Sequence, residues 1–329
     1  MMKATAMRFR PLGKTGVDVS EIGYGAWGIG GGWWTGSDDE ESLRSLQRAV
    51  DLGVNFFDTA AAYGDGHSER LLGRLLSQLD PGTSPALRVA SKIPPANGQW
   101  PPVEGTPLQD AFPRDHCFRV TEETLRNLGR DALDLQQFHA WLEEWAEDDG
   151  WLRTVEELKA SGLVRAVGIS LPRNKPWTGL EAAHSGVVDS FQVVYNLFEQ
   201  APEDELFPLC RELEIGVIAR VPLDEGGLSG TLTAGSRWPE ADFRSRYFAG
   251  DMLRETIERA KTIERDLVGG DVESLAEGAL RFCLSHEAVS TVIPGMRTAA
   301  HVAANVEAVE KGALPAPTLA RMRKRRWDR

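Results

Sequence analysis

The sequence predicts an α/β fold: one eight-stranded parallel β/α (TIM) barrel, with an N-terminal β-hairpin and extra C-terminal helices. Short β-rich runs alternate with amphipathic helical stretches, which is the pattern of parallel strands joined by crossover helices. Eight such units fall within 329 residues, and no linker rich in Gly, Pro or Ser interrupts them. We therefore expect a single domain over residues 1–329.

The opening hairpin is predicted at Met7–Arg10 and Val17–Ile22, because Gly13–Gly16 between them has the composition of a turn. Eight barrel strands follow, each a short β-rich run bounded by turn or helix signals. They are expected at Ile22–Ala26, Asn55–Thr59, Arg88–Ile93, Leu133–His139, Ala166–Ser170, Ser190–Tyr195, Gly216–Val221 and Val289–Pro294. The longest irregular segment, Leu223–Gly250, has the length of a lid or a clamp.

An open, doubly wound sheet is the alternative architecture. Such a sheet normally carries a G-x-G-x-x-G turn after its first strand, directly before a helix. At that place the chain reads Gly23-Tyr24-Gly25-Ala26-Trp27-Gly28, and no helical pattern opens behind it. The closed barrel is the better interpretation.

Acidic residues outnumber basic ones by 49 to 37, which gives a net charge of −12. This charge opposes a general attraction to nucleic-acid phosphates and to anionic membranes. No run of about 18 apolar residues occurs, so we expect no membrane span. A small molecule is the expected partner, and the oligomeric state is not indicated.

The three cysteines, Cys117, Cys210 and Cys283, are far apart and lack the spacing of metal ligands. We interpret them as reduced packing residues and expect no metal site. The first ten residues contain no apolar run that could act as a secretory signal. These features predict a reducing, cytoplasmic location.

Chemically useful side chains stand at the ends of three consecutive predicted strands. Asp58 is near the end of the second strand, with Tyr63 five positions later; Lys92 is near the end of the third, and His139 ends the fourth. In a β/α barrel the chemistry lies at the carboxyl ends of the strands. We therefore expect these four side chains to face one rim.

Each of the four has an ordinary alternative role, such as capping a turn, packing in the core or reaching for water. Their coincidence on neighbouring strand ends favours catalysis instead. A lysine ammonium lowers the pKa of a nearby tyrosine, and a carboxylate keeps that lysine charged. The sequence thus predicts that Lys92 and Asp58 make Tyr63 a stronger acid.

The segment Asn-Phe-Phe-Asp-Thr-Ala-Ala-Ala-Tyr-Gly at residues 55–64, followed by Ser68-Glu69 and Leu72-Gly73, resembles the most specific motif of the aldo-keto reductase family. The whole chain is similar to the bacterial, NADP-dependent members of that family. The resemblance implies that Tyr63 is the general acid of carbonyl reduction and that His139 orients the carbonyl oxygen. A bound nicotinamide would supply the hydride.

The resemblance also implies cofactor contacts at the strand ends. Gly25 and Trp27 match the turn and the pocket residue after the first strand, and Ser170 and Gln192 match the residues that hold the nicotinamide amide. The family usually has Asn directly after that serine, whereas this chain has Leu171, which puts one amide contact in doubt.

Arg220 is a second departure, because many members place an aromatic ring against the nicotinamide at this strand end. A guanidinium plane can also stack on a ring, but it brings a positive charge. We therefore expect Arg220 to keep the packing role and to change the electrostatics.

The loop after the seventh strand resembles the family's pyrophosphate clamp, in which glycines let backbone amides approach the phosphates. A flexible surface loop is the alternative. After the eighth strand the resemblance implies an adenosine-phosphate site and NADPH as the cofactor, with NADH possible because His301 and Ala304 replace the more usual residues. The residues concerned are Pro222, Leu223, Gly226, Gly227 and Gly230 in the loop, and Gly295, Arg297, His301 and Asn305 after the eighth strand.

Tryptophans follow several strand ends, and we expect Trp27, Trp100 and Trp141 to line the substrate pocket. The expected reaction is the reduction of an aldehyde or ketone, or the oxidation of an alcohol or sugar. A nicotinamide-binding regulatory protein with little turnover is the first alternative. A Schiff-base enzyme using Lys92 is the second, although Asp58 favours the charged, non-nucleophilic amine.

Overall fold

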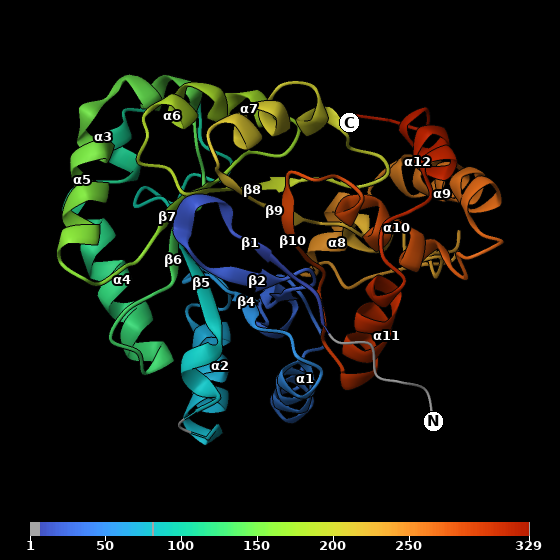
Figure 1. Cartoon of the computed structure of the whole chain (residues 1–329), viewed down its shortest axis with the longest axis horizontal. Helices are drawn as coiled ribbons and strands as arrows, with labels where there is room; N and C mark the ends of the chain where they lie inside the picture. The colour runs from blue at the N-terminus through green and yellow to red at the C-terminus, as the bar shows by residue number, and fades with distance from the viewer. Residues whose placement is uncertain (1–6, 81, 329) are drawn as a thin grey trace.

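The computed structural model describes residues 7–80 and 82–328, and it confirms the predicted barrel with its opening hairpin (Figure 1). The hairpin pairs β1 (Phe9–Pro11) antiparallel with β2 (Asp18–Ser20). The eight parallel barrel strands are β3 (Tyr24–Gly25), β4 (Phe56–Asp58), β5 (Arg88–Ile93), β6 (Leu135–Phe138), β7 (Val167–Ser170), β8 (Ser190–Val194), β9 (Gly216–Arg220) and β10 (Val289–Ile293).

Isolated bridges between the first and last strands close the barrel. Ile22 bridges Val292, and Gly25 bridges Gly295, both in the parallel sense. A Cβ atom on Gly25 would lie 2.8 Å from the carbonyl oxygen of Ile293. The two chain segments can therefore approach this closely because residue 25 is a glycine.

Several strands are shorter than the sequence predicts. The first pairs as a strand over two residues rather than over Ile22–Ala26, and the fourth spans Leu135–Phe138 rather than Leu133–His139. Staggered strands of a closed barrel lose their neighbours at different heights, so the residues at both ends leave the hydrogen-bonded sheet. His139 consequently lies just beyond β6, at the rim.

Crossover helices surround the strands, and most neighbours in the ring pack together (Figure 1). They are α1 (Asp39–Asp51), α2 (His67–Gln78), α4 (Arg114–Leu128), α5 (Asp149–Ala160), α6 (Leu180–His184), α7 (Leu206–Glu212), α10 (Leu275–Leu284) and α11 (Ala299–Glu310). Additional helices are α3 (Leu108–Ala111), α8 (Phe243–Tyr247), α9 (Met252–Leu267) and the C-terminal α12 (Ala316–Arg323). No helix in the described part of the chain has the length and apolar character needed to cross a membrane.

The hairpin covers the amino-terminal mouth of the barrel. Leu12 belongs to one cluster of buried side chains with Phe56 and Leu135, the first residues of β4 and β6, and with Ile218 in the middle of β9. The guanidinium of Arg10 donates hydrogen bonds to three backbone carbonyls, at the end of α10, in the turn that follows it and at the start of β10. The hairpin thus closes one end of the barrel, and the chemistry is confined to the opposite rim.

A substitution at Gly216, at the start of β9, tests how tightly the hairpin packs against the barrel. A Cβ atom there would lie 2.6 Å from a methyl group of Leu12 and 3.0 Å from its backbone carbon. We expect Gly216→Ala to lower the free energy of unfolding by about 1–3 kcal/mol, the usual effect of overpacking. The measurement is urea unfolding followed by circular dichroism.

Gly82→Ala is the matched control, because a Cβ at exposed Gly82 meets nothing within 4 Å. Its free energy of unfolding should change by less than about 0.5 kcal/mol. If both variants and the wild type had the same midpoint of urea unfolding, the hairpin would not pack against β9 as described.

Candidate active site

The four predicted catalytic side chains lie together at the open rim of the barrel. Asp58 ends β4, Tyr63 follows it in a turn, Lys92 lies near the end of β5, and His139 directly follows β6. The Lys92 ammonium donates hydrogen bonds to Asp58 Oδ2 at 2.6 Å, to the Thr59 carbonyl at 2.8 Å and to the Tyr63 hydroxyl at 3.2 Å. The rings of Tyr63 and His139 meet edge to face at 5.7 Å.

Burial is the largest influence on the pKa of Tyr63. It raises the pKa of the phenol above its ordinary value, and the Lys92 ammonium opposes this shift only in part. The Asp58 carboxylate raises the pKa further. Lys92 lowers the pKa more than Asp58 raises it, so the pair acts in the expected direction, but burial outweighs both and the net shift is upward.

Lys92 is charged and His139 is neutral at neutral pH. Burial opposes the charged form of Lys92, but Asp58 and the other oxygens around the ammonium leave its pKa raised. For His139, burial and the nearby cations Lys92 and Arg220 hold the pKa well below its ordinary value. Its Nδ1 atom is buried and has no hydrogen-bond partner among the described residues.

Asp58 is held by two glutamines from across the barrel. Gln192 of β8 donates from Nε2 to Asp58 Oδ1 at 2.8 Å, and Gln137 of β6 donates to the same oxygen at a longer 3.4 Å. Gln192 also donates to Gln137 Oε1 at 3.3 Å. Ser170, the last residue of β7, stands beside Gln192 in the strand register.

Arg220 ends β9 and reaches back across the rim. Its Nη2 atom donates to the carbonyl oxygen of Leu171, directly after β7, at 3.0 Å. Its Nε atom is buried without a partner among the described residues. The charged group thus lies on the same rim as Tyr63, and each influences the pKa of the other.

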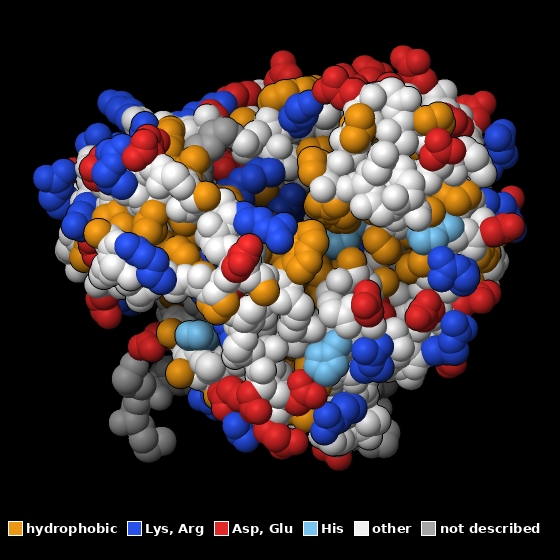
Figure 2. Space-filling view, turned by 180° about the vertical axis from the view of Figure 1, so that it is seen from behind, with side chains coloured by type: hydrophobic (Ala, Val, Ile, Leu, Met, Phe, Trp, Pro, Cys, Tyr) orange, Lys and Arg blue, Asp and Glu red, His pale blue; other side chains and the backbone are white. Residues whose placement is uncertain are grey.

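Aromatic rings border the four residues. The Trp27 ring lies 5.2 Å from Trp34, 5.2 Å from Phe243 and 6.3 Å from Tyr63. Trp100 is 46% exposed and meets the His139 ring edge to face at 4.2 Å. Figure 2 shows the face opposite the hairpin, where a hollow holds Lys or Arg side chains next to hydrophobic ones.

The prediction that Trp141 lines this pocket is wrong. Its side chain is fully buried, and its ring packs against Phe138, Trp145 and Trp151 at 5.1–5.9 Å. A position shortly after a strand end does not fix the direction of a side chain, and here the ring turns into the core under α5. Trp141 therefore supports the barrel rather than the substrate.

The loop after β9 is folded on itself. The amides of Gly226 and Gly227 donate to the Leu223 and Asp224 carbonyls, at 2.9 and 2.8 Å. The expected approach of these amides to a phosphate would require them to exchange these internal partners. Pro222 is buried, and Gly230 is exposed with a φ of +77°, a conformation that favours glycine.

Arg297 follows Gly295 and Met296 at the other end of the rim, and its guanidinium donates to the Gly36 carbonyl. Its Nε atom is also buried without a partner among the described residues. His301 and Asn305 lie on α11, whose first amide, Ala299 N, donates to Glu41 at 3.2 Å. An internal carboxylate therefore occupies part of the predicted phosphate site.

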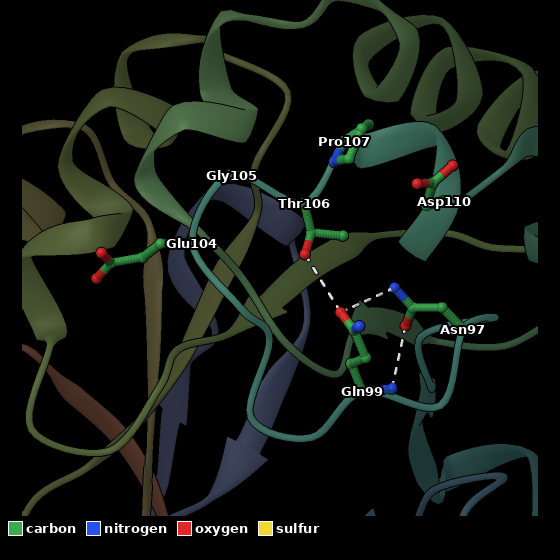
Figure 3. A pocket seen from close by; sticks show the side chains of 7 residues that line it. All are labelled: Asn97, Gln99, Glu104, Gly105, Thr106, Pro107 and Asp110. Atoms are coloured by element: carbon green, nitrogen blue, oxygen red, sulfur yellow. Dashed lines mark hydrogen bonds between the residues drawn. The ribbon is translucent and has the colours of Figure 1, made fainter.

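The loop after β5 contains an open pocket lined by Asn97, Gln99, Glu104, Gly105, Thr106, Pro107 and Asp110 (Figure 3). The Gln99 side-chain oxygen accepts from Thr106 Oγ1 at 3.2 Å and from Asn97 Nδ2 at 3.3 Å. These polar groups satisfy one another. These hydrogen bonds help to shape the loop that carries Trp100.

Sequence reasoning missed an acidic group beside the rim. Arg173 forms ion pairs with Glu199 at 2.8 Å and with Asp224 at 3.0 Å, and Tyr247 donates to Asp224 at 2.6 Å. Burial raises the pKa of the neighbouring Glu225 to about 7. The sequence signal that could have predicted this group is the pair of consecutive acidic residues, Asp224 and Glu225, inside a loop expected to bind phosphate.

Comparison with solved structures gives the same architecture. AKR11C1 from Bacillus halodurans, an aldo-keto reductase solved in a holo form, aligns over 97% of this chain and 96% of its own, with a TM-score of 0.76 and 27% identity. The glycerol dehydrogenase AKR11B4 from Gluconobacter oxydans aligns over 98% and 95%, with a TM-score of 0.76 and 25% identity.

Curated relatives include enzymes and a channel subunit. The aldo-keto reductase YhdN of Bacillus subtilis is 25% identical over 88% of this chain and 85% of its own. An NADH-specific methylglyoxal reductase of Escherichia coli is 29% identical over 69% and 71%. A probable voltage-gated potassium channel subunit beta of Oryza sativa is 27% identical over 92% of each chain.

The family model described as "Aldo/keto reductase family" matches residues 21–325, nearly the whole chain from the end of the hairpin onward. This match agrees with the barrel fold and with the grouping of Asp58, Tyr63, Lys92 and His139 at one rim. The chain belongs to the aldo/keto reductase family and is an oxidoreductase.

Proposed function

We propose that this enzyme reduces an aldehyde or ketone with NADPH, or oxidises the corresponding alcohol or sugar, with Tyr63 as the general acid or base. The observation that carries the proposal is the hydrogen-bonded set of Asp58, Lys92 and Tyr63 beside a neutral His139. When bound, the nicotinamide supplies or accepts the hydride.

In the reducing direction Tyr63 donates its proton to the carbonyl oxygen. Its raised pKa keeps the phenol protonated at neutral pH, which is the form that a proton donor needs. The Lys92 ammonium, 3.2 Å from the hydroxyl, stabilises the phenolate that remains. In the oxidising direction that phenolate takes the proton of the alcohol.

His139 and the tryptophans position the substrate. A neutral imidazole can donate a hydrogen bond to the carbonyl oxygen without competing with Tyr63 as an acid. Trp27 and Trp100 border the space beside these two residues and offer ring faces to an apolar or sugar-like substrate. Lys92 acts as a charge and not as a nucleophile, because its raised pKa disfavours the free amine that a Schiff base requires.

The rim fits a dinucleotide cofactor. Arg220 and Arg297 each hold a buried Nε atom without a partner among the described residues, one beside Tyr63 and one before α11. Such groups suit a ligand with acceptor atoms at both places. We propose that the nicotinamide lies by Ser170, Gln192 and Arg220 and that the adenosine lies by Arg297 and Asn305.

Tyr63→Phe tests the proton donor. The change removes only the hydroxyl and keeps the ring against Trp27, so NADPH should bind as in the wild type. We expect kcat for a reactive aldehyde to fall by about 10²–10⁴, the usual contribution of a general acid. NADPH affinity is measured by fluorescence titration and kcat by the loss of NADPH absorbance.

The substitution Lys92→Met tests how Lys92 affects the acidity of Tyr63. Without the ammonium the phenolate is less stable, so the pKa of Tyr63 should rise further and the alkaline limb of the pH–rate profile should move to higher pH. A Tyr63→Phe protein that binds NADPH and reduces the aldehyde at the wild-type rate would refute the assignment of the acid.

The choice between NADPH and NADH depends on two opposing charges. Arg297 can pair with the 2′-phosphate of NADPH, a contact of about 1.5–3 kcal/mol, or roughly ten- to a hundredfold in affinity. Glu41 lies on the first amide of α11 and repels that phosphate. We expect NADPH to bind more tightly than NADH, Arg297→Met to remove the difference and Glu41→Gln to increase it.

The measurement is the dissociation constant of NADPH and of NADH for the wild type, Arg297→Met and Glu41→Gln. NADH affinity should change little in Arg297→Met, because NADH has no 2′-phosphate. Equal affinity of the wild type for the two cofactors would contradict the proposal. The NADH-specific methylglyoxal reductase among the relatives makes this comparison informative.

Trp100→Ala tests where substrate choice is made. Because Trp100 covers His139 at 4.2 Å, its removal should change the ranking of kcat/KM across a panel of aldehydes, ketones and sugars. NADPH affinity should stay the same. Trp177→Ala is the matched control, since Trp177 is similarly exposed, at 44%, and lines a different pocket, with Pro202 and Leu206. An unchanged ranking in Trp100→Ala would place Trp100 outside the substrate pocket.

A regulatory nicotinamide-binding protein is the second candidate, because a relative of similar length is a probable potassium channel beta subunit. The two candidates differ in turnover: an enzyme oxidises bound NADPH repeatedly with some member of the substrate panel, and a regulatory protein does so at most once. The presence of the Asp58, Tyr63, Lys92 and His139 set favours the enzyme.

We also propose a reducing, cytoplasmic location and a partner that is a small carbonyl or alcohol. Cys117, Cys210 and Cys283 are all buried and unpaired, which suits a reducing compartment. The net charge of −12 does not favour nucleic acid or anionic membrane as a partner.

A further inference from the structure

Arg220 holds its guanidinium over the carboxyl end of β8. The residue ends β9, β8 lies between β9 and β7, and the Nη2 atom reaches the Leu171 carbonyl beyond β7 at 3.0 Å. The side chain therefore spans the strand that carries Gln192, in register with Ser170. This is the place where the proposed function puts the nicotinamide ring.

The charge of Arg220 is not neutralised by a direct partner. Lys92 has Asp58 at 2.6 Å, and Arg173 has Glu199 and Asp224 within 3.0 Å. Arg220 makes no ion pair with any described residue, and its buried Nε atom makes no hydrogen bond with one. Arginine keeps its proton even where burial disfavours the charge, so this group is a cation without an ion-pair partner, whose charge the carboxylates of Glu225 and Glu199 offset only in part.

The backbone around Arg220 fixes its position. The next residue, Val221, has a φ of +56°, which is rare for a β-branched residue and needs support from its surroundings. Its carbonyl accepts hydrogen bonds from Asn196 Nδ2 at 3.0 Å and from the Asp224 amide at 3.1 Å. The Tyr195 amide donates to the Arg220 carbonyl at 3.3 Å. The backbone that carries Arg220 is thus held at the rim, and the hydrogen bond to Leu171 holds the guanidinium.

We propose that Arg220 makes this enzyme bind the reduced nicotinamide more tightly than the oxidised one. The oxidised ring carries a positive charge and the reduced ring is neutral, so a fixed cation beside the ring repels only the oxidised form. The inference rests on the proposed nicotinamide binding. It follows by linkage that Arg220 shifts the equilibrium on the enzyme toward reduced cofactor and oxidised substrate.

The test is the ratio of two dissociation constants, that of NADP⁺ divided by that of NADPH, measured by titration calorimetry. We expect Arg220→Met to lower this ratio by roughly tenfold, the effect of removing one unscreened charge a few ångströms away. Arg220→Lys keeps a cation and should keep most of the ratio. Arg220→Gln, which retains a hydrogen-bond donor without the charge, should behave like Arg220→Met and also serves if the methionine variant does not fold.

Arg297→Met is the matched control, because Arg297 lies at the proposed adenosine end, where the two cofactor forms are identical. It should weaken NADP⁺ and NADPH equally and leave the ratio unchanged. A ratio that stays at the wild-type value in both Arg220→Met and Arg220→Gln would overturn the inference while leaving the proposed function intact. A wild-type protein that binds neither dinucleotide would overturn both.

Discussion

The buried ion pair between Lys92 and Asp58 is the interaction on which the rest of the site depends. Both side chains are almost completely buried, and their atoms are 2.6 Å apart. Removing two charges from water costs about as much as their attraction returns, so such a pair contributes little to stability. What it provides is a fixed ammonium beside Tyr63. The glutamines of β6 and β8 hold Asp58 from the far side, so four strands of one barrel determine a single proton site.

The charges around Tyr63 suit a donor that is neutral before the reaction and charged after it. Burial keeps the phenol protonated, while Lys92 and Arg220 both favour the phenolate. Burial, with a smaller contribution from the same two cations, keeps His139 neutral. The excess positive charge at this rim thus acts on three groups at once: it assists loss of the Tyr63 proton, adds to the lowering of the His139 pKa and, by our inference, distinguishes the two states of the cofactor.

The strand ends could be predicted from sequence because they depend on local patterns. The Asn55–Gly64 segment and the residues before His139 carry both the β pattern and the functional side chains, so the barrel brings Tyr63, Lys92 and His139 together as expected. Contacts between distant segments have no such signal. The inward turn of Trp141 depends on packing against Trp145 and Trp151, and the contact of Glu41 with the start of α11 joins residues 258 positions apart.

The segment between β9 and α9 is the clearest example of such a long-range contact. Thr35 donates to the buried carboxylate of Asp242 at 2.8 Å, and the Phe243 amide donates to the Trp33 carbonyl at 2.7 Å. Burial acts to raise the pKa of Asp242, but hydrogen bonds from Arg244 and Thr35 lower it below the usual range. These polar contacts, together with the Phe243 ring against Trp27 and the Arg244 guanidinium over the Trp34 ring, hold this segment against the loop after β3. Because much of the segment is exposed, its local opening is expected to cost less free energy than unfolding of the barrel.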